Sequence, residues 1–348
     1  NLGFDGPVYS MVKNNNTLYI GGDFTTISSN SRTRLAAIDL STTTLTSFNP
    51  SVNGIVNALA LGGDKLFIGG SYTLVGISAR SNLSSVWLNT GIVTAWNPSP
   101  NSSVLALATK GAIVYAGGNF VTINASSAPN LAAIDTAGVL QPLSSGMDNN
   151  VSALAISGNT LYAGGAFTKA GGQYRRSLAA FDLSTNTLAS FNSESSGTVS
   201  ALAISGSSMY VGGNFTSIGG ATRNRAASFN ITTKALNSWA PDFNGLINEM
   251  LLNGNTLYAC GAFGTVNGIT RSRLAAVDAT TGAVGSFNAG TFTGISVFSM
   301  VTDGTLLYFG GNFTQVNGNT RNRLAAVDLA CGSLDSWNPN LSGLVNDL

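Results

Sequence analysis

The apolar residues of this chain alternate with polar ones in short pieces, and one stretch shows the plan clearly. Residues 56–61, 65–70, 82–88 and 93–98 read VNALAL, KLFIGG, NLSSVWL and VTAWNP, and each has the length of a β-strand. A Gly-Gly-Asp turn follows the first piece and an Asn-Thr-Gly turn follows the third, while a longer loop joins the second to the third. Because hairpin turns favour these residues, the stretch predicts an antiparallel four-stranded sheet.

The same unit returns along the whole chain. Its clearest marker is a glycine doublet followed two residues later by an aromatic residue, as in LYIGGDF, and the aromatic residues recur at intervals of 47 to 50 residues. They are Phe24, Tyr72, Phe120, Phe167, Phe215, Phe263 and Phe313. A period of roughly 40 to 50 residues with strand-like content is typical of a β-propeller, in which each repeat forms one blade. We therefore predict an all-β fold, a seven-bladed β-propeller of four-stranded antiparallel blades that occupies residues 1–348 as one domain.

The repeated glycines and aromatic residues have a structural interpretation. Glycine has no Cβ, so it allows either a close backbone approach or a positive φ where the second strand ends. The aromatic residue after the doublet is expected to fold over the neighbouring blade. A second aromatic set precedes the connection to the next blade and is expected to wedge between blades. This set comprises Phe48, Trp96, Phe191, Trp239, Phe287 and Trp337.

The repeat also resembles a known family. Its consensus, LYxGGxFTxVNGxTRxRLAAVDxxTGxLxSWNP, is best seen from Leu307 to Pro339 and resembles the delta-60 repeat of large bacterial surface and secreted proteins. It is similar to Kelch blades as well, which share the glycine doublet and the later tryptophan. The resemblance covers essentially the whole chain, and it implies an extracellular propeller that binds or scaffolds and brings no catalytic residues with it.

Composition narrows the possible partners and the location. Charged residues make up 9% of the chain, far below the usual quarter, and the net charge is +1, so a nucleic-acid partner is not expected. No apolar run approaches the roughly 18 residues that span a bilayer, and no membrane span is predicted. The chain starts at Asn1 without a signal-like segment, which suits a mature secreted protein or a trimmed piece. We predict an extracellular or cell-surface location.

The chain contains no histidine, which removes the commonest general base and the usual imidazole metal ligand. An aspartate recurs at the end of the third predicted strand, where it is expected to cap its own turn. It occurs as Asp39, Asp135, Asp182, Asp278 and Asp328. A glycosidase needs two carboxylates at one site, and the sequence offers no privileged pair. We predict that the protein is not an enzyme and that it uses no cofactor and no metal.

Arginines recur just before the third strand in six of the seven repeats. They are Arg32, Arg80, Arg175, Arg223, Arg271 and Arg321, and a second arginine follows two residues later as Arg34, Arg225, Arg273 and Arg323. Residues two apart share one face of a strand, so each pair is expected to lie together near the rim. These side chains either hold each blade to its neighbour, through an aromatic ring or loop carbonyls, or form a positive collar for acidic sugars, carboxylates or phosphate.

Blades two and three break the repeat. Blade two has Trp87 where five other blades have aspartate, and blade three has Ala128 in the arginine position beside Pro129. Binding sites on repeat proteins can lie where the symmetry fails. Trp87 and the six arginines are therefore the candidate ligand-binding residues.

Two cysteines lie at different places in the repeat. Cys260 replaces the first glycine of a doublet, and Cys331 lies in the turn after a third strand, at the opposite rim. A disulfide needs Cα atoms within about 7 Å, which is shorter than a blade strand. We expect two free and mostly buried thiols, with a reactive or metal-binding cysteine as the alternative.

The two ends carry one strand copy too many. GPVYSMV near the start and SGLVNDL at residues 342–348 both match the segment that opens each blade, so there are eight first-strand copies for seven blades. Residues 341–348 are interpreted as an extra copy, which continues into further chain or joins an assembly by strand addition.

The predicted function is a non-enzymatic extracellular or cell-surface module for adhesion, assembly or protein binding, with possible self-assembly through the termini. The alternatives are a lectin-like propeller that binds a glycan at the cell surface and, less favoured, a polysaccharide-active enzyme.

Overall fold

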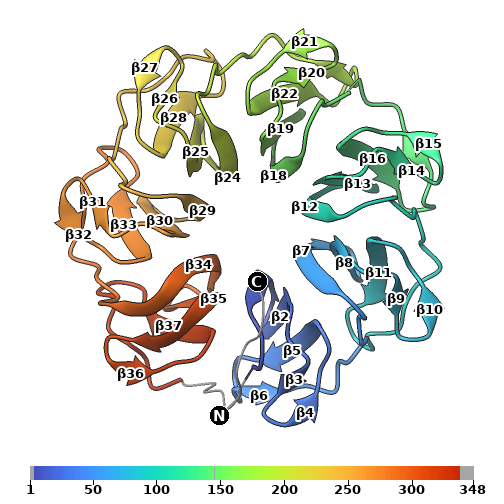
Figure 1. Cartoon of the computed structure of the whole chain (residues 1–348), viewed down its shortest axis with the longest axis horizontal. Coiled ribbons are helices and arrows are strands. Elements are labelled where there is room, and N and C mark those ends of the chain that lie inside the picture. Colours follow the sequence, from blue (N-terminus) through green and yellow to red (C-terminus); the bar gives the residue numbers. More distant parts are fainter. Residues whose placement is uncertain (1–3, 145, 338–348) are drawn as a thin grey trace.

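The computed structural model describes residues 4–144 and 146–337, which form seven antiparallel sheets arranged in a ring (Figure 1). The predicted seven-bladed β-propeller is confirmed. The first strand of each blade lies nearest the centre of the ring. These strands are β1 (Val8–Asn14), β7 (Ile55–Gly62), β12 (Val104–Lys110), β18 (Val151–Ser157), β24 (Thr198–Ser205), β29 (Ile247–Asn253) and β34 (Phe292–Thr302).

The second and third strands follow outward in each sheet. The second strands are β2 (Thr17–Gly22), β8 (Lys65–Ser71), β13 (Ile113–Gly118), β19 (Thr160–Gly165), β25 (Ser208–Asn214), β30 (Thr256–Gly261) and β35 (Leu306–Val316). The third strands are β5 (Leu35–Asp39), β11 (Leu83–Trp87), β16 (Leu131–Asp135), β22 (Leu178–Asp182), β28 (Ala226–Asn230), β33 (Leu274–Asp278) and β37 (Leu324–Asp328).

The fourth strand is the shortest part of each blade. It is two residues long in β6 (Thr44–Leu45), β17 (Leu140–Gln141) and β23 (Thr187–Leu188). In the other four blades it is a single bridge, Val86 to Val93, Phe229 to Leu236, Val277 to Val284 and Val327 to Leu334. The outer strand therefore adds little backbone pairing, and its main contribution is the aromatic residue that follows it.

The loop between the second and third strands contains a small two-stranded ribbon, which the sequence pattern did not predict. The ribbons are β3 (Thr26–Ile27) with β4 (Asn30–Ser31), β9 (Leu74–Val75) with β10 (Ser78–Ala79), β14 (Thr122–Ile123) with β15 (Ser126–Ser127), β20 (Lys169–Ala170) with β21 (Gln173–Tyr174), β26 (Ser217–Ile218) with β27 (Ala221–Thr222) and β31 (Thr265–Val266) with β32 (Ile269–Thr270). In blade seven, β36 (Asn319–Thr320) pairs with the end of β35. The ribbons lie toward the outside of the ring (Figure 1).

The core of the molecule lies between the blades. Seven clusters of buried apolar side chains occur in the part of the chain that the structure describes, and each cluster joins two neighbouring blades. In β2, Leu18 and Ile20 face blade seven while Tyr19 faces blade two, and Ala36 and Ala37 of β5 alternate in the same way. Because both faces of the sheet are covered there, the second and third strands are buried at nearly every position.

The glycine doublets allow these faces to meet. A Cβ on the first glycine would lie 2.4 to 2.8 Å from the β-branched residue in the next blade's first strand, as with Gly21 and Val56. A Cβ on the second glycine would lie 2.0 to 2.5 Å from a carbonyl oxygen, as with Gly22 and Pro7. None of the doublet glycines has a positive φ. Close approach is therefore the reason for glycine here, and the alternative of a left-handed backbone does not apply.

The aromatic residues before each connection wedge between blades, as expected. Trp96 packs edge-on against Phe67, with ring centroids 5.0 Å apart, and its indole N–H donates to the carbonyl of Asp135 in the next blade at 2.7 Å. Trp239 makes the equivalent bond to Asp278 at 3.0 Å. These two tryptophans therefore combine apolar burial with one hydrogen bond across the blade boundary, whereas the phenylalanines at this position contribute apolar burial alone.

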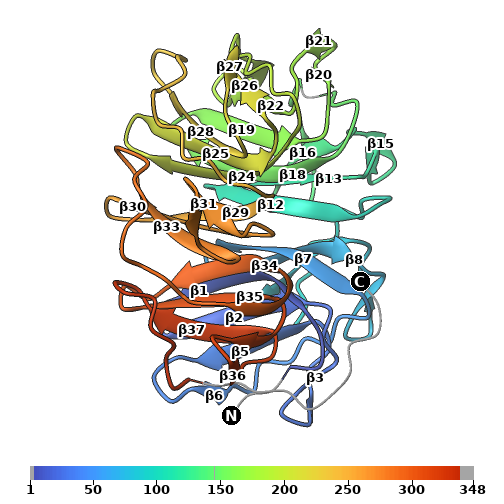
Figure 2. The ribbon, with the colours of Figure 1, turned by 60° about the vertical axis from the view of Figure 1, so that its left-hand side comes forward.

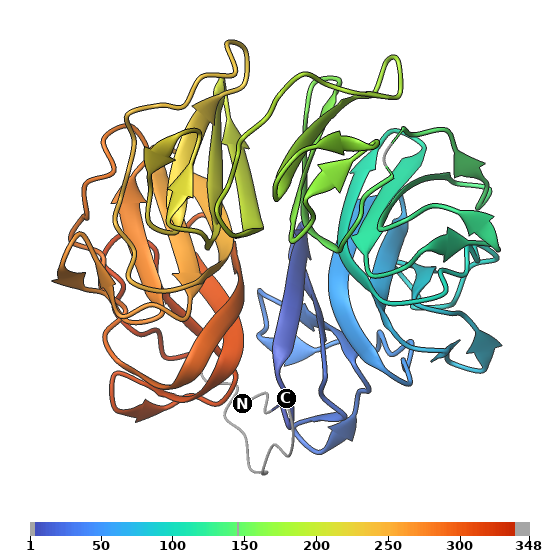
Figure 3. The same cartoon turned by 45° about the horizontal axis from the view of Figure 1, so that its top comes forward.

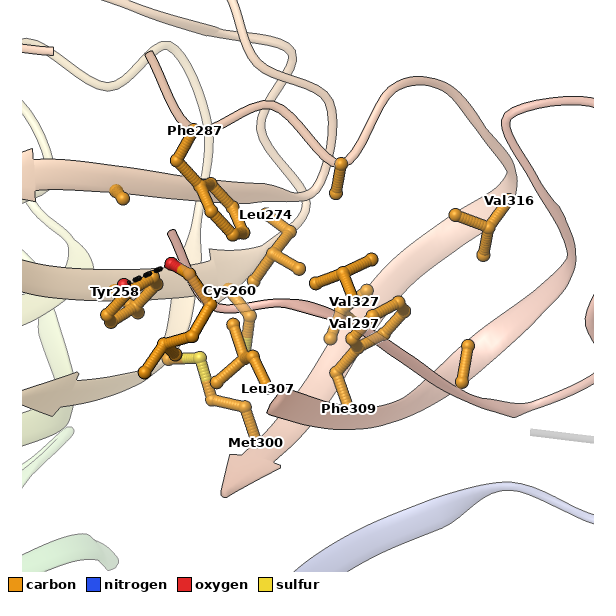
Figure 4. Packing of buried hydrophobic residues seen from close by; sticks show 14 of the residues in the cluster. Tyr258, Cys260, Leu274, Phe287, Val297, Met300, Leu307, Phe309, Val316 and Val327 are labelled. Carbon is orange, nitrogen blue, oxygen red and sulfur yellow. Dashed lines mark hydrogen bonds between the residues drawn. The ribbon is translucent and has the colours of Figure 1, made fainter. Parts of the chain in front are cut away.

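Blade six departs from the doublet pattern, and Figure 4 shows its boundary with blade seven. Cys260 lies in the apolar cluster with Val297 and Met300 of blade seven, and Tyr258 donates to the carbonyl of Leu329 at 2.6 Å. Both cysteines are free. Cys260 is buried as expected, but the expected burial of Cys331 is wrong, because its turn lies at the rim and leaves the residue exposed.

Blade one and blade seven complete the ring by side-chain packing. Figure 2 shows β34 and β35 beside β1 and β2, and in Figure 3 the blue first blade lies between the red seventh blade and the lighter blue second blade. Val8 occupies the space beside Gly310, and Leu324 joins the cluster that contains Phe24. The predicted extra strand copy at residues 341–348 lies outside the described residues.

Because the backbone approaches closely at the glycine doublet, adding one methyl group there is expected to destabilise the fold strongly. We expect Gly165→Ala to lower the free energy of unfolding by about 3 kcal/mol, because its Cβ would lie 2.1 Å from the backbone oxygen of Asn150. Gly285→Ala is the control, since a Cβ there meets nothing within 4 Å, and a change within about 0.5 kcal/mol is expected. Urea denaturation measures both, and equal effects would contradict this account.

Candidate functional site

The recurring aspartates are used by their own turns. Asp278 accepts hydrogen bonds from the backbone N–H groups of Thr280 at 2.9 Å and Thr281 at 2.6 Å, and the bond from Thr281 is the main reason that the pKa of Asp278 lies below its usual value. The bond from the residue two positions later also occurs at Asp39, Asp135, Asp182 and Asp328, and Asn230 makes it in blade five. The predicted turn-capping role is confirmed, and the carboxylates are distributed among separate blades.

The first arginine of each pair bonds carbonyl oxygens of its own blade. Arg271 donates from Nη1 to Thr270 O at 2.8 Å and from Nη2 to Gly285 O at 2.8 Å. The same pair of bonds, to the preceding residue and to the residue fourteen positions later, occurs at Arg32, Arg80, Arg175, Arg223 and Arg321. The expected bonds to loop carbonyls are present, but they join the ribbon to the blade's own outer edge and do not reach the neighbour. Binding of acidic ligands by these arginines stays a prediction.

The second arginines do not share a strand face with the first. Arg34 and Arg225 have φ values of 65° and 66°, in the left-handed region, so the strand alternation is interrupted just before β5 and β28. Their Nη1 groups donate to the carbonyls of Phe24 and Phe215, at 3.2 Å and 2.9 Å. Arg34 also forms an ion pair of 2.6 Å with Asp23. The prediction of paired side chains on one face is therefore wrong.

Trp87 lies at the other end of the third strand from the arginines. β11 is five residues long, roughly 17 Å, and ends at Trp87, so Arg80 and Trp87 belong to opposite edges of blade two. The Trp87 side chain is 36% exposed, and the Lys65 ammonium lies over its ring at 5.2 Å from the centroid. The candidate residues therefore do not form one site.

A recess of about 660 Å³ lies beside Trp87. We call it the blade-two recess. It is lined by Asn14 of blade one and by Asp64, Trp87, Asn89, Thr90 and Ile92 of blade two. Sequence reasoning identified Trp87 but missed Asn14 and Asp64, since both belong to ordinary hairpin turns and only the ring brings the two turns together.

The centre of the ring contains a second, smaller hollow of about 220 Å³, lined by all seven first strands. Each first strand has a register shift after its first buried residue. Polar side chains at this bulge bond the next blade, as Asn57 does to Val104 O at 3.1 Å and Ser200 to Ile247 O at 2.5 Å. These bonds form an inner set of links between blades that the sequence pattern did not reveal.

Glu249 is an exception within this inner set. The aligned residues of the other first strands are serine or alanine, so a glutamate at this position was the available sequence signal. Its carboxylate accepts a hydrogen bond of 2.6 Å from the backbone N–H of Met300 in blade seven. Burial raises the pKa of Glu249 to about 7, and the pKa of the neighbouring Cys260 thiol is raised too, mainly by burial.

The fold defines the chain as a β-propeller, and its repeated aspartates and arginines form hydrogen bonds within their own blades. A family model described as "Domain of unknown function (DUF5122) beta-propeller" matches residues 302–336, which lie in blade seven. Comparison with curated proteins finds no match. The described residues contain no helix that is long and apolar enough to cross a membrane, and none of their His, Cys, Asp or Glu side chains gather in threes to hold a metal.

Two solved structures share the fold. The chain is similar to a computationally designed protein, Ika8, with 16% identity and a TM-score of 0.61, over 99% of this chain and 92% of that one. It is also similar to the WD40 β-propeller domain of Doa1, with 13% identity and a TM-score of 0.62, over 89% of this chain and 91% of that one. At such identities the likeness describes the architecture alone.

Two adjacent arginines test the structural interpretation of the repeated position. Arg175 donates to Tyr174 O at 2.7 Å and Ala189 O at 3.2 Å. Arg176 beside it is exposed and occupies a position that holds no arginine in the other blades. We expect Arg175→Met to lower the free energy of unfolding by about 1 to 2 kcal/mol, because two carbonyls lose their donors. Arg176→Met should change it by less than about 0.5 kcal/mol. Equal losses in thermal or urea unfolding would contradict a role in the blade.

Glu249 predicts a specific pH dependence. Because folding raises its pKa from 4.5 to about 7, the native state holds a proton that the unfolded state releases, and stability falls as pH rises between these values. Glu249→Gln keeps an acceptor for Met300 without the charge, so at pH 8 we expect it to be more stable than the wild type by about 3 kcal/mol, with little difference at pH 4. Glu194→Gln, at the exposed second glutamate, is the control. A difference that is the same at both pH values would contradict the assignment.

Proposed function

We propose that this protein is a non-enzymatic binding module that acts outside the cell or on its surface, in adhesion or assembly. In general, a propeller fold suggests a module for interactions with other proteins. The extracellular location is supported by the low content of charged residues and by the resemblance to repeats of bacterial surface and secreted proteins. The fold does not identify the partner, which has to be inferred from the residues of the site.

The observation that carries the proposal is the break in the repeat at Trp87. In the other blades this position holds an aspartate or asparagine that its own turn uses, whereas blade two presents an exposed indole beside a recess of about 660 Å³. Exposed aromatic residues beside a concave surface are typical of binding sites. Blade two is therefore the part of the ring that is best suited to a partner.

An enzymatic function has less support. The recurring aspartates are engaged by separate turns, and Glu249 points into the inner set of blade contacts, where it bonds Met300. A polysaccharide-active site would need two carboxylates that face one substrate. A lectin-like function remains the second candidate, because the recess combines an aromatic ring with amide and carboxylate groups.

The proposal is tested by binding of the labelled full chain to intact cells and extracellular material of the organism that encodes it. We expect saturable binding that unlabelled protein competes and that a heat-unfolded sample lacks. Absence of saturable binding, or turnover of polysaccharides by the purified chain, would overturn the proposal.

A further inference from the structure

The aromatic residue of the blade-two recess is not required by the turn that carries it. Gly91 N donates to Trp87 O at 2.8 Å, as Gly282 N does to Asp278 O at 2.8 Å, so the backbone turn is the same with and without the aspartate. The aspartate side chain adds two hydrogen bonds to its turn, and Trp87 cannot replace them. Blade two thus gives up turn bonds and exposes an indole in their place.

The indole forms one side of a partly apolar surface. Trp87 pairs directly with Lys65 across β8 and β11 in blade two (Figure 1), and the Lys65 ammonium lies over the ring. Ile92, which is 63% exposed, also lines the recess. Because an aromatic ring offers a flat apolar platform, it suits a ligand that has an apolar face of similar size.

Polar groups surround this platform. Asn14, Asn89 and Thr90 line the recess with Asp64, and amides both donate and accept hydrogen bonds whereas a carboxylate accepts them. A ligand with several hydroxyl groups around an apolar face fits this arrangement, since each hydroxyl can donate to the carboxylate or exchange bonds with an amide. The pyranose ring of a sugar has this chemistry.

The charged groups at the recess indicate whether it suits a neutral or an acidic sugar. Asp64 is the one ionisable side chain among the described residues that line the recess, and the nearby Lys65 is engaged over the indole. The opposite charges of Asp64 and Lys65 leave the recess with no net positive charge, and it has no arginine to hold a uronic acid or a phosphate. We infer that the blade-two recess binds a neutral sugar residue of a polysaccharide, with Trp87 stacked on the apolar face of the sugar and Asp64 and Asn14 bonding its hydroxyls.

This inference rests on the proposed binding function and gives it a ligand class. It is tested with the full chain and the methyl glycosides of glucose, mannose, galactose and N-acetylglucosamine, with glucuronate as the charged probe. Saturation-transfer NMR and indole fluorescence measure binding. We expect one or more neutral probes to bind, with glucuronate at least tenfold weaker.

Two variants test whether the sugar binds at the blade-two recess. Trp87→Asp restores the residue of the other blades, so it is expected to fold, and it should weaken sugar binding at least tenfold. Tyr174→Ala is the matched control, because Tyr174 is 70% exposed and has Lys169 over its ring at 5.5 Å, yet it lies on a ribbon of blade four. Tyr174→Ala should leave sugar binding unchanged.

The outcomes separate the two proposals. Binding to cells without binding of any neutral probe overturns the sugar inference and leaves the binding function in place, while loss of both overturns both. Preference for glucuronate, or unchanged binding in Trp87→Asp, would also show that the recess is not a neutral-sugar site.

Discussion

The structure depends on the absence of one carbon atom, the Cβ of the first doublet residue, at six of the seven blade boundaries. In six of seven blades the first glycine of the doublet leaves space for a valine or isoleucine of the next first strand, as Gly164 does for Val199. The same contact between Gly310 and Val8 closes the ring. Because a Cβ on these glycines would overlap the side chain of the next blade, this steric constraint sets the spacing at these six boundaries and allows the apolar layers between the blades to pack.

Hydrogen bonds between neighbouring blades add to this packing at two distances from the centre of the ring. Near the centre, side chains at the strand bulges bond the next blade, and farther out Trp96 and Trp239 do the same through their indole N–H groups. Blade six differs at both positions of this inner region, with Cys260 in place of glycine and Glu249 in place of a small residue. Burial is the main reason that the pKa values of both groups are raised, so the stability of the boundary between blades six and seven depends on protonation of Glu249.

The scaffold and the candidate site use different residues for a physical reason. A polar side chain that recurs in most blades meets the same local backbone each time, so the repeated aspartates and arginines are bonded to their own turns and loops. Trp87 occurs once and has no equivalent partner in its turn. A side chain that its own turn does not engage is available to a ligand, and this distinction favours the blade-two recess over the arginine rim as the place of binding.

The sequence by itself determined the number of blades and the order of their strands, because these follow from period, turn residues and alternation within a single repeat. For the doublet glycines it left close approach and a positive φ as alternatives, and the structure decided for close approach. It also identified Trp87, since a break in a repeat is visible in one dimension. Only the tertiary structure decided which groups lie together. The left-handed backbone at Arg34 separates residues that a strand would have aligned, and the ring brings Asn14 of one blade beside Asp64 of the next. Contacts between repeats depend on how the blades close into a ring, and no local pattern encodes that geometry.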